Sequence, residues 1–231
     1  MAHKRKSNTT RLEIIQVATR MFLERGHSKT TVKAIADQLD ISSGHLMFYF
    51  PTKEHLLAQL VEMLCDFQWK MMQSVVEEGN TSLMAVCLEM ATMAAMCEED
   101  EIAKDVYLSA YSNPLTLEII RKNDAERARI VFSEYCPDWE ERDFAEAEIL
   151  VSGIEYATLM TTDDSIPLDT RVAGAINNIL TTYNVPEEIR RMKIHKVLAL
   201  DYRNIGKRIL NEFKEYVAEV SEQAFEEVLY G

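Results

Sequence analysis

The segment ISSGHLMFYFPTKEHL, which runs from Ile41 to Leu56, is the most informative stretch of this 231-residue chain. It sets two serines, a glycine and a histidine beside three aromatic residues, and continues into a proline and a lysine. A buried helix would not begin with so many polar residues, and a surface loop would not carry so much aromatic mass. The segment therefore indicates about two turns of helix that face a partner with both polar and apolar groups.

The residues before this segment predict two helices that brace it. Residues 9–25 carry one apolar stripe and are followed by Gly26, a common helix stop. Residues 31–39 carry apolar side chains at i, i+3, i+4 and i+7, so that one face is buried. In the third helix, residues 43–49, we expect Leu46 and Phe50 to point inward and the opposite side to face outward.

Two short helices that are joined by a tight turn and braced by a longer helix form a helix-turn-helix. The second helix of this unit fits the major groove of DNA, where serine and histidine can bond base edges and an aromatic ring can touch a thymine methyl group. A tyrosine hydroxyl can reach a phosphate. Phosphates at the two edges of the groove are predicted to be bound by residues that flank this helix. Lys53 lies at the start of the following helix, and Thr30 and Thr31 lie at the start of the helix before it.

These residues resemble the DNA-binding domain of the TetR family of bacterial transcriptional regulators. The resemblance rests on three stretches in order, RLEIIQVATRMFLERG, TTVKAIADQLDIS and GHLMFYFPTKEHLL, over residues 9–56. The chain departs from the family at three positions. Met47 stands where the family usually has an aromatic residue that touches phosphate, His45 where threonine is usual, and Asp40 where glycine is usual. With Met47 in place, Tyr49 is expected to carry more of the phosphate contact.

The resemblance also implies roles for individual residues. The base-facing residues are Lys33, Ser42, Ser43, Gly44, His45 and Phe48. The phosphate-binding residues are Thr30, Thr31, Tyr49 and Lys53. On this basis Lys53→Ala is expected to weaken binding to every sequence and to flatten its salt dependence by about one unit of slope.

The distribution of charge fits a basic module joined to an acidic body. The net charge is −13, which alone argues against nucleic acid. Residues 1–53, however, hold nine Lys and Arg against four Asp and Glu, whereas residues 54–231 hold 16 against 34. We therefore expect two domains, a helix-turn-helix domain over 1–53 and a helical domain over 54–231. A solvated basic tail is the alternative explanation of the charge.

The chain is predicted to be all-α. Its five prolines fall between long periodic segments, and few stretches alternate as a half-buried strand does. The expected helices are 9–25, 31–39, 43–49, 52–78, 82–98, 100–112, 114–135, 138–162, 168–183 and 186–228, the last with one or two breaks.

Several classes of protein are disfavoured. The four cysteines, Cys65, Cys87, Cys97 and Cys136, form no C-x-x-C pair, which favours free thiols in a reducing cytoplasm. No apolar run is long enough to span a membrane, and no signal peptide is evident. Because no catalytic or metal-binding motif is present, we expect no enzyme, no cofactor and no metal.

Methionine is concentrated in one region, since seven of the twelve methionines lie between Met63 and Met96. Methionine fills irregular apolar space, which suits a pocket for a small molecule, and the resemblance implies an effector pocket in this domain. The candidate pocket residues are Phe67, Met71, Met90, Met93, Tyr107 and Tyr111. No basic residue has the pattern of a buried one, so we expect an apolar or aromatic effector. Alternatively, these residues form an ordinary core.

Residues 138–183 are rich in small side chains that let helices approach closely, and the resemblance implies a homodimer formed by two late helices. The segment from 186 to the end is longer than usual in the family, and either adds to the dimer face or covers the pocket. The expected function is a sequence-specific DNA-binding transcriptional repressor that a small effector releases from a palindromic operator.

Two other functions remain open. The chain could be a helical protein-interaction module with a vestigial helix-turn-helix, or a helical enzyme with a fused DNA-binding domain. The basic N-terminus disfavours the first, and the absence of acid–base or metal motifs disfavours the second. Binding to genomic fragments at several salt concentrations separates the regulator from the interaction module.

Overall fold

The computed structural model describes residues 2–77, 81–161 and 165–230, and every regular element in these ranges is a helix. The helices are α1 (Ala2–Arg25), α2 (Val32–Gln38), α3 (Ser43–Tyr49), α4 (Lys53–Glu77), α5 (Ser82–Glu99), α6 (Glu101–Ser112), α7 (Pro114–Val131), α8 (Glu141–Met160), α9 (Leu168–Thr182), α10 (Glu187–Leu198) and α11 (Tyr202–Tyr230). The all-α prediction is confirmed. No helix in the described ranges is both long enough and apolar enough to cross a membrane.

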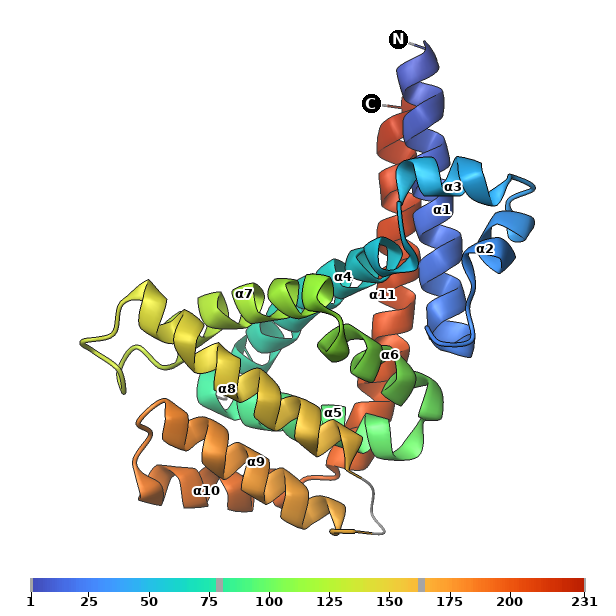
Figure 1. Ribbon diagram of the computed structural model, residues 1–231. Coiled ribbons are helices and arrows are strands. Elements are labelled where there is room, and N and C mark those ends of the chain that lie inside the picture. The colour runs from blue at the N-terminus through green and yellow to red at the C-terminus, as the bar shows by residue number, and fades with distance from the viewer. Residues whose placement is uncertain (1, 78–80, 162–164, 231) are drawn as a thin grey trace.

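The first three helices share one small core. Ile14 and Phe22 of α1, Ile35 of α2 and Leu46 of α3 are all fully buried, as their helical spacing predicts. Helix α4 begins next to this unit and runs without interruption into the larger helical body (Figure 1). The two parts are therefore connected by a continuous rod rather than by a flexible linker.

Helix α5 lies at the centre of the larger body. Its sequence is apolar on nearly every face, and twelve of its eighteen residues are buried. A helix of this kind requires neighbours on all sides. It packs against α4, α6, α8, α9, α10 and α11, while α7 lies between α4 and α8 (Figure 1).

The C-terminal helix α11 lies beside both parts of the molecule. It crosses α5 and then runs along α1, so that the two ends of the chain lie at the same end of the structure (Figure 1). The crossing at α5 is tight at Gly206, where an added Cβ would stand 3.0 Å from the Thr92 carbonyl oxygen and 3.3 Å from Met96 Cγ. Glycine is therefore needed there for close packing.

Three expected helix boundaries were wrong. Helix α1 begins at Ala2 instead of residue 9. Helix α7 ends at Val131 instead of residue 135, because the next residue, Phe132, turns inward and stacks on Tyr183 with ring centroids 4.0 Å apart. Helix α8 begins at Glu141 instead of residue 138. The one or two breaks expected in the segment 186–228 are confirmed as a single break between Leu198 and Tyr202. The ends expected at 78 and 162 lie outside the described residues.

Candidate DNA-binding surface and effector cavity

Helix α3 forms an exposed ridge on a buried base. Its N-cap is Ser42, whose Oγ accepts a hydrogen bond of 3.1 Å from the His45 amide and so fixes the start of the helix. Leu46 and Phe50 are buried, as expected. Gly44 and His45 are exposed on the opposite side, so the N-terminal half of this helix is open to a partner.

The ridge continues into aromatic side chains. Phe48 is 81% exposed, and Met47 is 49% exposed. The ring of Tyr49 lies 5.6 Å from that of His45 and 5.4 Å from that of Phe48, both measured between centroids. An aromatic ring as exposed as that of Phe48 gains little from the fold itself, which indicates a contact outside the chain.

Helix α2, which packs against α3, carries further candidate residues at its N-terminus. Thr31 is the N-cap, and its Oγ1 accepts a hydrogen bond of 3.1 Å from the Ala34 amide. Thr31 and Lys33 are both exposed. Thr30, in contrast, is buried, and its hydroxyl donates to the Gly26 carbonyl at 2.7 Å. The expectation that the Thr30 side chain binds phosphate was therefore wrong, because its hydroxyl is used to close the α1–α2 loop.

Lys53 also has a different role from the expected one. Its ammonium donates to the carbonyl oxygens of His27 and Thr30, at 2.8 and 3.1 Å. These bonds tie the start of α4 to the α1–α2 loop. Two of the three N–H donors of the ammonium are thus used within the chain, which favours a structural role for this side chain over the expected phosphate contact.

The α1–α2 loop is also held from the larger body. The carboxylate of Asp105, on α6, accepts a hydrogen bond of 2.8 Å from the Ser28 amide. The loop approaches closely at Gly26, which has φ +86, and an added Cβ there would stand 2.5 Å from Asp105 Oδ2. The loop that precedes α2 is thus fixed by α4 on one side and by α6 on the other.

One departure from the family pattern carries a backbone cost. Asp40, in the turn between α2 and α3, has φ +52. This left-handed conformation favours glycine, and aspartate is among the few other residues that tolerate it. The glycine that is usual at this position in the resembled family would adopt it without strain.

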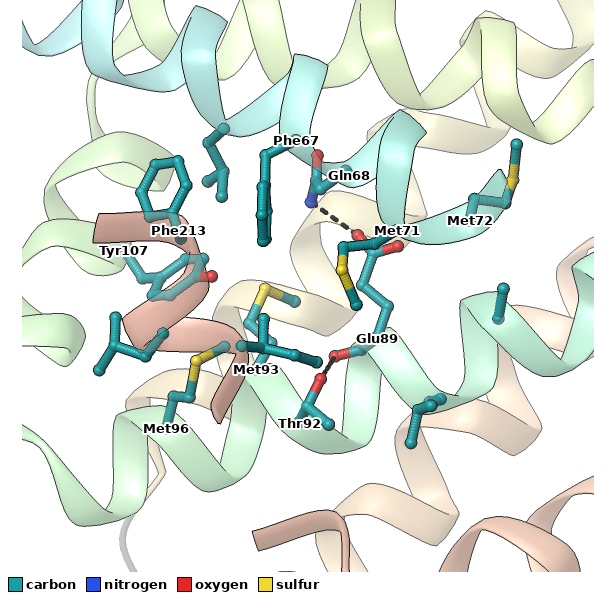
Figure 2. Close-up of a pocket in the computed structure, with 15 residues that line it drawn as sticks. Phe67, Gln68, Met71, Met72, Glu89, Thr92, Met93, Met96, Tyr107 and Phe213 are labelled. Atoms are coloured by element: carbon teal, nitrogen blue, oxygen red, sulfur yellow. Dashed lines mark hydrogen bonds between the residues drawn. The ribbon is translucent and has the colours of Figure 1, made fainter. Parts of the chain in front are cut away.

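The larger body contains an apolar cavity of about 60 Å³ between α4, α5, α6 and α11 (Figure 2). Four of the six candidate residues line it, namely Phe67, Met71, Met93 and Tyr107. Figure 2 shows Phe67 and Tyr107 with Phe213 at one end and Met93 and Met96 below them. The cavity is smaller than a drug-sized pocket, but flexible methionines form much of its wall.

Two candidates lie elsewhere. Met90 does not line this cavity but a second one, of about 40 Å³. Tyr111 lines neither, and its hydroxyl donates to Glu155 at 2.9 Å. Both residues lie on the side of α5 and α6 that faces α7 and α8, outside the larger cavity, and their assignment to an effector pocket stays a prediction.

Helix α11 supplies part of the cavity wall, with residues that were not among the six candidates. Ile209, Leu210 and Phe213 line the apolar cavity, and the Phe213 ring lies 5.4 Å from that of Phe67. Of the two roles left open for the C-terminal segment, its last helix therefore takes that of covering the cavity. A groove beside α10 shares Met71, Leu88 and Ile209 with the cavity and lies on the other side of these residues.

The second cavity is surrounded by charged groups that no sequence motif indicated. Arg127 is 5% exposed and pairs with Glu89 and with Asp124, the latter at 3.2 Å. Buried basic residues therefore do exist, contrary to expectation. The signal was helical spacing, since Asp124 and Arg127 continue the series from Ile120 to Val131 at i, i+4, i+7 and i+11.

The described side chains offer no metal site, and no group of three or more potential ligands occurs among them. The four cysteines are free and buried. Burial raises the pKa of the Cys65, Cys87 and Cys97 thiols to about 12, so these thiols are unreactive near neutral pH.

Comparison with known proteins matches the first part of the chain. The model of the bacterial regulatory proteins of the tetR family matches residues 14–60. The HTH-type transcriptional repressor KstR2 of Mycobacterium tuberculosis (strain H37Rv) is 36% identical over 76 residues, which make up 33% of this chain and 38% of that protein. The HTH-type transcriptional regulator YuxN of Bacillus subtilis (strain 168) is 26% identical over 106 residues, 46% of this chain and 36% of that protein. The chain spans little more than a third of the length of these relatives.

The solved structure of the TetR family protein CprB from S. coelicolor A3(2) aligns with 90% of this chain and 99% of that chain, at 20% identity and a TM-score of 0.43. The sequence match covers α2, α3 and the second half of α1, together with the start of α4. These are the helices that form the exposed α3 ridge and the core beneath it. Residues 14–60 of the chain are thus similar to the N-terminal helix-turn-helix of the bacterial regulatory proteins of the tetR family.

Proposed function

We propose that the chain is a DNA-binding transcriptional repressor that leaves its operator when a small molecule occupies the cavity of the helical body. The observation that carries the proposal is the α3 ridge, in which His45 and Phe48 are exposed over the buried Leu46. Relatives that are named transcriptional repressors support repression rather than activation. The division into a DNA-binding domain over 1–53 and an effector domain over 54–231 is part of this proposal.

On DNA, α3 lies in the major groove. Ser43, Gly44 and His45 occupy its N-terminal half, which reaches base edges in helix-turn-helix proteins. Phe48 contacts thymine methyl groups. The exposed Thr31 and Lys33 at the start of α2, and Tyr49 at the end of α3, contact phosphates or base edges at the rim of the groove. The phosphate contact of the α4 start comes from its free backbone amides rather than from the Lys53 side chain.

The effector acts through α6 and α11. Tyr107 on α6 lines the cavity, and Asp105, two residues earlier, holds the Ser28 amide in the α1–α2 loop. Helix α11 lines the cavity with Phe213 and then packs along α1. A ligand that displaces Tyr107 or Phe213 shifts the elements that orient the helix-turn-helix, and so changes its affinity for DNA.

The repressor acts as a C2 homodimer through α8 and α9. Ile149, Leu150 and Met160 of α8 are about half exposed or more. Gly153 of α8 and Gly174 of α9 are exposed, and an added Cβ at either position would meet no atom within 4 Å. The chain itself therefore gives no reason for glycine there, whereas a closely packed partner helix does. A dimer would place two α3 helices on one palindromic site, in the cytoplasm where the chromosome lies.

The test is binding to genomic fragments, measured by fluorescence anisotropy at several salt concentrations. The expected result is tight binding to one class of fragment and a linear fall of log K with log salt. His45→Ala is expected to relax discrimination at one base pair, whereas Lys29→Ala, an exposed change in the α1–α2 loop, should leave discrimination unchanged. Equal affinity of wild type and His45→Ala for every duplex would refute the assignment of His45 to a base edge. Failure of the wild-type chain to bind any fragment would favour the alternative of a protein-interaction module with a vestigial helix-turn-helix.

A further inference from the structure

Two cavities lie side by side in the helical body and share two of their wall residues, Glu89 and Met93. The larger is the apolar, methionine-lined cavity of Figure 2, where the Glu89 carboxylate accepts a hydrogen bond of 2.6 Å from the Gln68 side chain. The smaller, of about 40 Å³, is lined by four carboxyl groups. These belong to Glu89, Asp124, Glu148 and Glu155.

The cations around the smaller cavity do not balance these carboxyl groups. The two terminal nitrogens of Arg127 pair with Glu89 and Asp124. Glu148 accepts only the Tyr183 hydroxyl, and Glu155 accepts only the Tyr111 hydroxyl, among the contacts recorded for the described side chains. A phenol donates one hydrogen bond but brings no positive charge, so neither carboxyl group has an ion-pair partner among the described residues. Arg121 and Arg127 lie near enough to Glu148 to favour its charged form, but Arg121 Nε donates to Ser152 and Arg127 pairs with Glu89 and Asp124.

An unpartnered atom faces this space. Glu148 is 2% exposed, and its Oε2 has no hydrogen-bond partner. Buried carboxyl oxygens without partners are rare and costly. Arg127 Nε, in the wall of the same cavity, is a second buried polar atom without a partner. The wall of this cavity therefore holds two polar atoms without hydrogen-bond partners, in addition to two carboxyl groups without ion-pair partners.

The protonation of the cavity follows from its burial. Burial, reinforced by the negative charge of Asp124, raises the pKa of Glu148 to about 8. Burial and the charges of Asp124 and Glu148 raise the pKa of Glu155 well above its ordinary value. Both shifts favour the protonated carboxyl groups, and a cation that entered the cavity would favour release of a proton.

We propose that the effector carries a protonated amine that pairs with Glu148 and Glu155, while its apolar body occupies the methionine-lined cavity. The inference rests on the proposed effector-binding function and names the chemical class of the ligand. Glu89 and Met93 form a wall common to the two cavities, and the flexible methionine can move aside so that one molecule occupies both. An anionic head group would meet four carboxyl groups and one arginine that is already paired, which disfavours it.

The probes are n-hexylamine, 1-hexanol and hexanoate, which share a six-carbon chain and differ in the charge of the head group. Binding to the full chain is measured by calorimetry at pH 6, 7 and 8. We expect hexylamine to bind at least tenfold more tightly than hexanol at pH 8, and hexanoate to bind more weakly than either. The affinity for hexylamine should rise by up to tenfold per pH unit, because its binding expels a proton from a carboxyl group. Equal binding of hexylamine and hexanol, or tighter binding of hexanoate, would overturn the proposal.

Variants locate the amine. Glu148→Gln keeps the size of the side chain and its bond from Tyr183, and is expected to lose the tenfold preference for hexylamine while it still binds hexanol. The control is Glu146→Gln, an exposed change on the same helix, which should behave as wild type. Retained hexanol binding shows that Glu148→Gln is folded, and an unchanged preference for hexylamine in that variant would refute the assignment.

The two proposals fail separately. If the chain binds its operator but none of the three probes, the cavities hold only water, and the amine proposal is wrong while the regulator remains. If hexylamine binds with the expected preference but no genomic fragment is bound, the ligand class stands and the DNA-binding function is wrong.

Discussion

At the scale of single residues, two lysines near the α3 ridge have opposite roles. Lys33 is exposed, whereas the Lys53 ammonium is bonded to two backbone carbonyls. Both follow the spacing of the TetR pattern, and the sequence could not separate them. The partners of Lys53 are carbonyls of the α1–α2 loop, 26 and 23 residues away in the chain, and no local pattern predicts such bonds.

Lys53→Ala is expected to lower the free energy of unfolding by about 1–3 kcal/mol, because two carbonyls lose a charged donor. Lys33→Ala should leave stability within about 0.5 kcal/mol and reduce the slope of log K against log salt by about one. Urea denaturation and salt-titrated DNA binding on both variants check this. If Lys53→Ala had wild-type stability but a slope of log K against log salt reduced by one, Lys53 would be a phosphate-binding residue instead.

Glu148 predicts how stability depends on pH. Its pKa is raised to about 8 in the folded chain, by burial first and then by Asp124. The folded state therefore holds a proton that the unfolded state releases near pH 4.5, and stability falls as pH rises from about 5 to 8. Each unit of pKa difference corresponds to about 1.4 kcal/mol.

Glu148→Gln should remove this part of the pH dependence, so that the variant loses less stability than wild type between pH 5 and pH 8. Thermal unfolding at three pH values, with Glu146→Gln as the exposed control, measures the difference. Parallel curves for wild type and Glu148→Gln would mean that Glu148 is ionised in the folded chain.

At the scale of elements, amphipathic spacing accounts for most of the fold. The helices α2 and α3 were predicted within one residue at each end, because their apolar residues and caps lie inside the segment itself. The pattern did not predict the end of α7, which depends on Phe132 stacking on Tyr183. Glu148 and Glu155 of α8 continue the spacing of the buried Phe144 and Val151, so the carboxyl groups of the second cavity were detectable from the sequence.

Helix α11 is the element whose place in the fold the sequence left open. Its contact with α5 depends on Gly206, where a Cβ would stand 3.0 Å from the backbone oxygen of Thr92. Gly206→Val is therefore expected to push α11 away from α5 and to destabilise the chain by about 1–3 kcal/mol. The control Ala218→Val adds the same branched side chain at an exposed position of the same helix.

Because α11 lines the cavity with Phe213 and packs along α1, Gly206→Val should also change how a ligand affects DNA binding. The measurement is the ratio of operator affinities with and without a bound probe. A Gly206→Val protein that has wild-type stability and an unchanged ratio would show that α11 takes no part in the coupling, which would then rest on α6 alone.

At the scale of the whole molecule, the exposed face of α8 and α9 is the feature that the single chain leaves unexplained. Ile149 and Leu150 are more than half exposed, and the neighbouring Gly153 has open space above it. Exposed apolar side chains on one helix face, together with small residues, fit a close helix–helix contact between two copies. Small residues could be seen in the sequence, but which of them face outward could not, since Ala147 and Ser152 are buried within the chain.

Leu150→Glu is expected to separate the dimer, because it would place two carboxylates in an apolar interface near the two-fold axis. Sedimentation should show a dimer for wild type and a monomer for Leu150→Glu at micromolar concentration, with unchanged helical content. Ser133→Glu, an exposed change outside α8 and α9, is the matched control and should remain dimeric. Because a monomer presents one α3 ridge instead of two, Leu150→Glu should also bind the palindrome more weakly and about as tightly as a half-site. A wild-type chain that sediments as a monomer, or a Leu150→Glu chain that remains a dimer, would place the interface on another face.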